Sequence, residues 1–147
     1  MEGVFQTGPE HRDELLIIWE EAVRATHHFL TEGDILFYRE SLKGALPEMD
    51  LYAIADDGVL AGFINPEEGM VHALFVRPAK AGRGFGKTLM EFAIREKGIS
   101  RVDVNEQNTA ALAFYERLGF EVFARRELDG AGKPYPLLML QLPEPLA

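Results

Sequence analysis

The chain contains no cysteine, and no apolar run in it approaches the length of about 20 residues that a membrane-spanning helix needs. Without cysteine there is no disulfide framework, no thiol nucleophile and no cysteine-based zinc site, which fits a reducing cytoplasm. The first residues, MEGVFQTGPEHRDE, are acidic and lack the basic segment and apolar core of a secretory signal. We therefore expect a cytoplasmic protein with no membrane partner.

Positive charge is also scarce. Fifteen lysines and arginines stand against 24 acidic residues, which gives a net charge of −9 and an isoelectric point near 4.9. This balance argues against nucleic acid as a partner. It favours an anionic ligand only where basic residues gather, and a cationic one elsewhere. With 147 residues and 47% apolar content, the sequence predicts a single domain, residues 1–147.

Residues 70–97 form the stretch around which the chain is organised, MVHALFVRPAKAGRGFGKTLMEFAIREK. The pattern predicts a strand over residues 70–76, closed by Pro78, then a basic glycine-rich turn, then an amphipathic helix from about Gly86 or Lys87. Glycines let backbone N–H groups approach a ligand closely, and the positive end of the helix dipole faces the same point. The stretch therefore predicts a phosphate or pyrophosphate site.

Two phosphate-binding motifs compete for this turn. AGRGFGKT nearly matches the G-x-x-x-x-G-K-[ST] loop of nucleoside triphosphatases, and AGRGFG nearly matches the R/Q-x-x-G-x-G/A turn of acetyl-CoA-dependent N-acetyltransferases. In both comparisons Ala81 replaces the first residue of the motif. The turn alone does not decide between them.

The remaining pattern predicts an α+β fold with a mixed, mostly antiparallel central sheet flanked by about four helices, in the order β-α-α-β-β-β-α-β-α-β-β. A helical stripe from Leu15 to Val23 predicts core contacts. Asp34 is the expected N-cap of the second helix, with Ile35, Leu36, Tyr38 and Leu42 turned inward, and Asn108 or Thr109 is the expected N-cap of the last helix. The expected strands are 4–7, 51–55, 59–64, 70–76, 101–105, 120–126 and 136–142, and the expected helices are 9–29, 34–46, 86–97 and 108–118.

Residues 105–120 read NEQNTAALAFYERLGF and contain the pattern N-x-x-A-x-x-F-Y-x-x-x-G-F. Together with the strand-turn-helix before it, this stretch resembles the GNAT superfamily of acetyl-CoA-dependent N-acetyltransferases. The segments ATHHFL, VNEQN and GKPYPLL are similar to a YjaB-like bacterial branch of that superfamily. A triphosphatase would need a doubly wound parallel sheet and a metal-binding Asp, for which Asp103 is the one candidate.

The resemblance implies that acetyl-CoA is the cofactor and that its pyrophosphate lies on the backbone of Arg83, Gly84, Phe85, Gly86, Lys87 and Thr88. The pantetheine arm would follow the strand edge at Leu74, Phe75 and Val76 and would meet Asn108 and Tyr115. Ala81 stands where the family often has a long side chain. Either Lys80 or Arg83 compensates for it, or cofactor binding is weaker or differently placed.

The implied chemistry is direct attack of an amine on the thioester in a ternary complex, without a metal. A lysine-like ammonium has a pKa of ~10.4 and needs a base, for which His72 is the candidate; the alternative is a core histidine with a satisfied N–H. Tyr115 matches the family's general acid for the leaving thiolate, and the N–H of Phe75 or Val76 would polarise the carbonyl.

The acceptor site is expected between the first two helices and the last loop, with the candidate residues Trp19, His27, His28, Phe29, Tyr38 and Tyr135. A protein lysine, a peptide terminus and a small amine all fit this set, and so do a monomer and a homodimer. The alternative from another class is a non-catalytic acyl-CoA-binding or sensor domain with the same fold.

Overall fold

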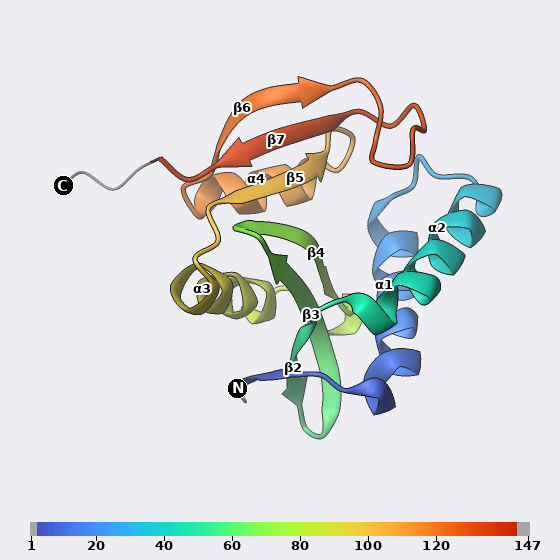
Figure 1. Cartoon of the computed structure of the whole chain (residues 1–147), viewed down its shortest axis with the longest axis vertical. Coiled ribbons are helices and arrows are strands. Elements are labelled where there is room, and N and C mark those ends of the chain that lie inside the picture. The colour runs from blue at the N-terminus through green and yellow to red at the C-terminus, as the bar shows by residue number, and fades with distance from the viewer. Residues whose placement is uncertain (1–2, 144–147) are drawn as a thin grey trace.

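The computed structural model describes residues 3–143 as a seven-stranded sheet with helices on both faces (Figure 1). The helices are α1 (Arg12–Thr26), α2 (Glu32–Ala45), α3 (Phe85–Lys97) and α4 (Thr109–Arg117). The strands are β1 (Val4–Gln6), β2 (Tyr52–Asp56), β3 (Val59–Glu67), β4 (Met70–Val76), β5 (Arg101–Asn105), β6 (Glu121–Arg126) and β7 (Leu137–Gln141). Apart from three short 3₁₀ turns at Pro9–His11, Leu46–Glu48 and Pro78–Lys80, this is the predicted order.

The sheet has the strand order β1-β2-β3-β4-β5-β7-β6, and every pair of neighbours is antiparallel except β4 and β5. The predicted mixed, mostly antiparallel α+β fold is therefore confirmed. The parallel pair is short, because only Met70 and Val71 of β4 are paired, with Arg101 and Val102 of β5. Beyond Val71 the two strands diverge, and the sheet splits into two parts that Figure 1 shows as its lower and upper halves.

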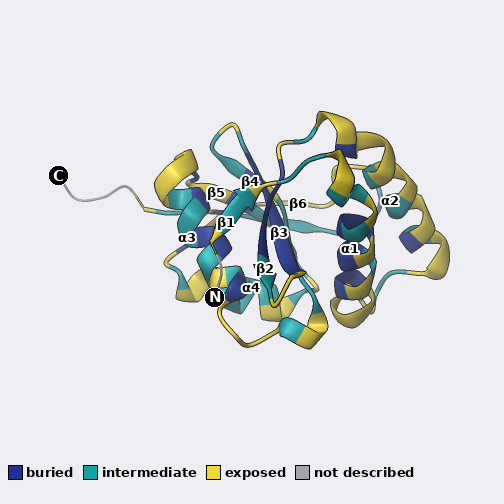
Figure 2. Cartoon of the chain, turned by 90° about the horizontal axis from the view of Figure 1, so that it is seen from below, coloured by how far each residue is buried: buried dark blue, intermediate teal, exposed yellow. Residues whose placement is uncertain are grey.

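Two apolar cores lie on the two faces of the sheet. On one face, α3 and α4 pack on the strands through buried residues such as Phe85, Leu89 and Tyr115. On the other face, α1 and α2 cover the sheet, as Figure 2 shows (buried residues in dark blue). The stripe expected on the first helix is confirmed, since Leu15, Leu16, Ile18, Trp19, Ala22 and Val23 are all buried.

Helix ends differ from the sequence prediction at two points that matter for the site. Helix α1 ends at Thr26, which leaves residues 27–29 outside it. The N-cap of α2 is Thr31 and not Asp34: the Asp34 N–H donates to Thr31 Oγ1 at 3.0 Å, and the Thr31 N–H donates to the Asp34 carboxylate at 3.1 Å. This reciprocal capping box starts the helix earlier than predicted.

Two side-chain and strand details also correct the prediction. Leu36 does not point inward but is 55% exposed, because its neighbour Ile35 occupies the core-facing position of α2. Strand β3 continues past Ile64 to Glu67, since a register shift between Asn65 and Pro66 accommodates the proline that cannot donate to a ladder. Among residues 3–143, no helix has the length and apolarity that crossing a bilayer requires.

Candidate active site

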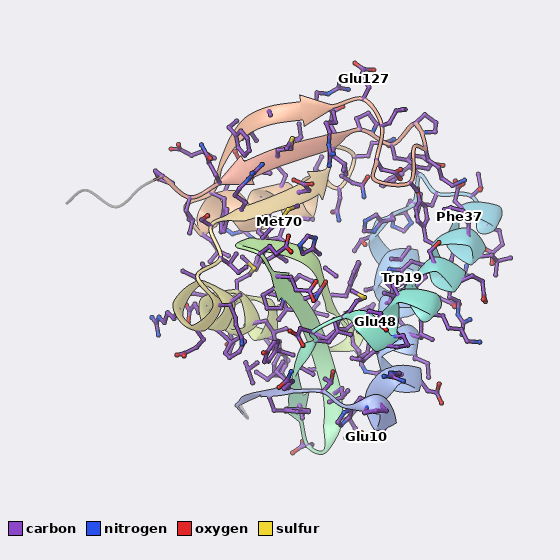
Figure 3. The ribbon with its side chains drawn as sticks, in the orientation of Figure 1. Glu10, Trp19, Phe37, Glu48, Met70 and Glu127 are labelled. Atoms are coloured by element: carbon purple, nitrogen blue, oxygen red, sulfur yellow. The ribbon has the colours of Figure 1, made fainter. Side chains whose placement is uncertain are left out.

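The divergence of β4 and β5 opens the main cleft of the molecule, with a volume of about 770 Å³. Its walls come from both halves of the sheet, from α4, from the C-cap of α1, from the middle of α2 and from the loop between β6 and β7. Figure 3 labels Met70 near the point where the two halves of the sheet meet. The lining includes the predicted site residues His27, Tyr38, His72, Leu74, Phe75, Asn108 and Tyr115.

The edge of β4 that faces this cleft carries backbone groups without a strand partner. The Arg77 N–H donates to Ala61 O at 2.8 Å, so Arg77 points its backbone groups toward β3. Because backbone groups alternate sides along an antiparallel pair, Phe75 also bonds toward β3, whereas the backbone groups of Leu74 and Val76 point away from β3. Of these two residues, Leu74 lines the cleft. Of the two N–H groups predicted to polarise a carbonyl, the geometry favours Val76 over Phe75.

The glycine turn lies beside the end of β4 and starts α3. Gly84 is the N-cap with φ +89°, a left-handed conformation that side chains other than glycine adopt at a cost. The first helical bond is Thr88 N–H to Gly84 O at 3.0 Å, so the N–H groups of Phe85, Gly86 and Lys87 have no acceptor within the helix. This arrangement fits a pyrophosphate, with the positive end of the helix dipole behind it.

Most side chains of the turn make contacts within the protein and are not free to bind a ligand. Phe85 is 2% exposed and packs in the core, so only its backbone is available to a ligand. Arg83 and Lys80 both form ion pairs with Asp56, at 2.8 and 2.9 Å, and these pairs hold the pKa of the Asp56 carboxyl below its ordinary value. Lys87 is exposed. The two cations expected to compensate for Ala81 are thus joined by one carboxylate.

Tyr115 is the buried phenol of the cleft. It lies on α4, is 6% exposed, and its burial alone raises its pKa. The phenol therefore stays protonated at neutral pH, which is the form that a proton donor needs. Asn108 lies about two turns earlier at the start of α4, where its Oδ1 accepts the Ala111 N–H at 3.2 Å, so Asn108 and not Thr109 is the N-cap.

His72 lies on β4 in the cleft lining and is exposed, so the alternative of a core histidine is wrong. Its Nε2 is 3.1 Å from the carbonyl oxygen of Glu67. A carbonyl only accepts, so Nε2 carries the hydrogen and the ring is held toward the β3–β4 turn.

A second cavity of about 210 Å³ adjoins the main cleft on the side of α1 and the loop between β6 and β7. Four of the predicted acceptor residues line it: Trp19, His27, Tyr38 and Tyr135. Trp19 is labelled on α1 in Figure 3. His28 is exposed and Phe29 packs between the rings of His27 and Tyr135, so these two do not line either cavity.

Hydrogen bonds tie α2 to the β6–β7 loop across this second cavity. The Tyr135 hydroxyl donates to the Asp34 carboxylate, and the Lys133 ammonium lies 3.1 Å from the other Asp34 oxygen. The bond from Tyr135, followed by the Thr31 backbone bond, lowers the pKa of Asp34. We call this group, together with the bond from the Tyr38 hydroxyl to Asp129, the α2–loop clamp.

Several lining residues escaped the sequence prediction. Asp129 lines both cavities, and its Oδ1 accepts the N–H groups of Ala131 and Lys133, each at 2.9 Å. Asn105 also lines both, at the end of β5. The sequence did carry a signal for Asp129, because Asp-Gly in a glycine-rich loop is typical of a carboxylate that organises a turn. It carried none for Arg101, Arg126 or Met139, which also line the main cleft. Asp103 lines it too and was named only as a candidate metal ligand.

A mixed sheet that splits after a short parallel pair, with a phosphate-type turn at the start of the helix between the split strands, defines an acetyl-CoA-type acyltransferase fold. The acetyltransferase (GNAT) family matches residues 12–120, and the chain belongs to this family. The triphosphatase alternative is wrong, because the strand before the glycine turn is antiparallel to its hairpin neighbour in a mixed sheet.

Individual relatives are similar over almost the whole chain. The peptidyl-lysine N-acetyltransferase YjaB of Salmonella typhimurium is 40% identical over 135 residues, which cover 91% of this chain and 93% of that protein. The solution structure of apo-form YjaB from Escherichia coli superposes with a TM-score of 0.90 at 34% identity, covering 96% of this chain and 97% of that one. The PaiA N-acetyltransferase of Thermoplasma acidophilum, solved with coenzyme A, shares the fold with a TM-score of 0.74 at 21% identity, covering 97% of this chain and 99% of that one.

Proposed function

We propose that this N-acetyltransferase moves an acetyl group from acetyl-CoA to the side-chain amine of a lysine in a protein or peptide. The observation that carries the proposal is the cleft between the diverging strands, which joins a buried phenol and an unpaired strand edge to a second cavity, while the glycine turn follows β4 outside the lining of the cleft. The peptidyl-lysine N-acetyltransferase relatives support lysine as the acceptor.

The donor would occupy the main cleft. Backbone N–H groups at the start of α3 would bind its pyrophosphate, and the free edge of β4 at Leu74 and Val76 would hydrogen-bond its pantetheine arm. The acceptor would enter through the second cavity, where Trp19 offers an apolar wall and Asp129 a carboxylate suited to a cationic amine.

Tyr115 would supply the proton that the leaving thiolate needs. Its raised pKa makes it a weak acid in water, but the same burial would raise the pKa of a thiol held beside it, so proton transfer stays favourable. Removal of a proton from the acceptor ammonium requires a base, and two imidazoles line the main cleft, those of His72 and His27.

The first test is thermal unfolding with acetyl-CoA, coenzyme A and Mg-ATP, each in large excess. A ligand at 100 times its dissociation constant adds about 2.7 kcal/mol to the unfolding free energy, which moves the midpoint by several degrees. We expect a shift with both coenzyme A species and none with Mg-ATP. No shift with acetyl-CoA would contradict the donor assignment.

The second test follows thiol release with three acceptors: a lysine peptide with a blocked N-terminus, a lysine-free peptide with a free N-terminus, and a polyamine. We expect the lysine peptide to be acetylated fastest. Binding of acetyl-CoA without thiol release from any acceptor would support the alternative, a non-catalytic acyl-CoA sensor.

A further inference from the structure

The main cleft and the second cavity share five lining residues, and these mark where donor and acceptor would meet. They are His27, Tyr38, Phe75, Asn105 and Asp129. Phe75 and Asn105 cannot take up a proton near neutral pH, and the Asp129 carboxylate is already engaged by Tyr38 and by two backbone N–H groups. The Tyr38 hydroxyl keeps its proton, because burial and then its bond to Asp129 raise its pKa, so His27 is the remaining group that can accept one.

The hydrogen bonds around His27 fix which ring nitrogen is free to act. Thr26 Oγ1 lies 2.8 Å from Ala22 O and 2.8 Å from His27 Nδ1. The Ala22 carbonyl only accepts, so the single hydroxyl proton goes to it, and His27 Nδ1–H must then donate to Thr26 Oγ1. Nε2 is therefore the unprotonated nitrogen, which is the atom that a base uses.

The ring of His27 is held from two sides and kept neutral. Phe29 packs against it with ring centroids 5.4 Å apart, and Thr26 holds the Nδ1 edge, so the Nε2 edge is left for the cavities. Burial, followed by the neighbouring charge of His28, lowers the pKa of His27. The ionisable groups that line the cavities with it are Tyr38, His72, Arg101, Asp103, Tyr115, Arg126, Asp129 and Tyr135.

His72 differs from His27 in its position and in the orientation of its ring. It lines the main cleft but not the second cavity, and its ring is turned toward the Glu67 carbonyl at the β3–β4 turn. His72 is therefore farther along the donor side and lies away from the wall that the two cavities share.

From this arrangement we infer that His27, through Nε2, is the general base that deprotonates the acceptor amine, and that Thr26 is the residue that positions it. The inference rests on the proposed amine acetylation. It assigns the base to the end of α1 and replaces the sequence-based candidate on β4.

The acceptor ammonium gives one proton to Nε2, directly or through a water, and its nitrogen lone pair then forms the bond to the thioester carbonyl carbon. The carbon–sulfur bond breaks, and the sulfur takes the proton of Tyr115. The second proton lost by the nitrogen returns to Tyr115, and the imidazolium of His27 releases its proton to solvent.

The tautomer is tested without any substrate. Long-range ¹H–¹⁵N NMR on the ¹⁵N-labelled chain should show His27 protonated at Nδ1 in its neutral form. Thr26→Ala, which removes the acceptor, should shift His27 toward the Nε2–H form, whereas Thr26→Ser should preserve the native tautomer. A neutral His27 protonated at Nε2 in the unsubstituted chain would overturn the inference.

Catalysis is tested with His27→Asn, which keeps an N–H donor near the place of Nδ1 but has no group at Nε2. We expect kcat/KM for the lysine peptide to fall by about 10²-fold at neutral pH, with a smaller loss as pH approaches the ~10.4 pKa of the amine itself. The control His11→Asn changes a histidine that lies before α1 and outside both cavities, and it should leave the rate unchanged.

His72→Asn separates the two candidate bases. A pH-dependent loss in His72→Asn together with an unchanged His27→Asn would overturn the inference while leaving the proposed function intact. A wild-type chain that binds acetyl-CoA but acetylates no amine would instead overturn the proposed function and the catalytic role of His27 with it.

Discussion

Tyr115 shows how one buried side chain can be both a core residue and a candidate acid. Its ring packs edge-on against Phe114 and Phe120, with centroids 5.1 and 5.9 Å away, while the residue also lines the main cleft. The packing fixes the ring, and the burial keeps its proton in place up to a pH above the ordinary phenol value.

Replacing Tyr115 by phenylalanine keeps the packing and removes the proton. We expect kcat to fall by about 10²-fold or more, because a positioned general acid contributes about 10²–10⁴-fold. The shift in unfolding midpoint caused by acetyl-CoA should be unchanged, which controls for folding and donor binding. In the unsubstituted enzyme, the raised pKa predicts no loss of activity from phenol ionisation between pH 7 and the ordinary value of ~10. Full turnover by Tyr115→Phe would contradict the assignment.

Ala81 marks the residue at which the glycine turn departs from its family. It is exposed, and its neighbours Lys80 and Arg83 are drawn to Asp56. Ala81→Arg is expected to lower the Kd of coenzyme A by about tenfold at low salt, because it adds a cation that Asp56 does not already hold. Isothermal titration would measure this, and the gain should shrink as salt rises. Ala79→Arg, an equally exposed change outside the turn, should gain less.

Helix α3 depends on a single backbone conformation at its start. Gly84→Ala places a Cβ at φ +89° and is expected to destabilise the fold by about 1 kcal/mol, measured by urea unfolding, and to weaken coenzyme A binding as well. The same change at Gly44 in α2 meets no atom within 4 Å and is expected to stabilise by about 0.5 kcal/mol. Equal effects at both positions would contradict the strain argument.

Helix α2 and the β6–β7 loop act together through the α2–loop clamp. Tyr38→Phe removes the hydroxyl that donates to Asp129, so we expect a looser loop and a several-fold higher KM for the lysine peptide, with the Kd of acetyl-CoA unchanged. Tyr52→Phe removes the hydroxyl of a buried tyrosine that lines neither cavity, and it serves as the matched control. A rise in the Kd of acetyl-CoA instead of the peptide KM would contradict the separation of the two cavities.

Elements that depend on local patterns could be predicted from the sequence, and contacts between distant segments could not. The stripe on α1, the strand over residues 70–76 and the Asn108 cap follow from spacing and residue type within one turn or strand. The bond from Tyr38 to Asp129 joins residues 91 positions apart, and no local signal specifies it. His27 and His28 could not be separated either, because the choice depends on α1 ending at Thr26 and not at Phe29.

At the scale of the whole molecule, the net negative charge and the carboxylate in the second cavity both favour a cationic acceptor. The body carries a net charge of −9, and the second cavity has the Asp129 carboxylate in its wall. A basic lysine peptide should therefore be steered toward the enzyme, and we expect its kcat/KM to fall as salt rises from about 0.05 M to about 0.5 M. A lysine peptide flanked by acidic residues is the control, and its rate should rise or stay level. An equal response of both peptides would contradict steering.

The two halves of the sheet share only two paired positions on each strand, Met70 and Val71 with Arg101 and Val102. Such a short ladder connects the two halves weakly. Hydrogen exchange of the backbone amides should therefore show a different free energy of opening for each half. A donor that hydrogen-bonds both sides of the cleft would bridge the diverging strands, so that the two halves would open as one cooperative unit. Amides of β5, β6 and β7, remote from the glycine turn, would then become protected when acetyl-CoA binds.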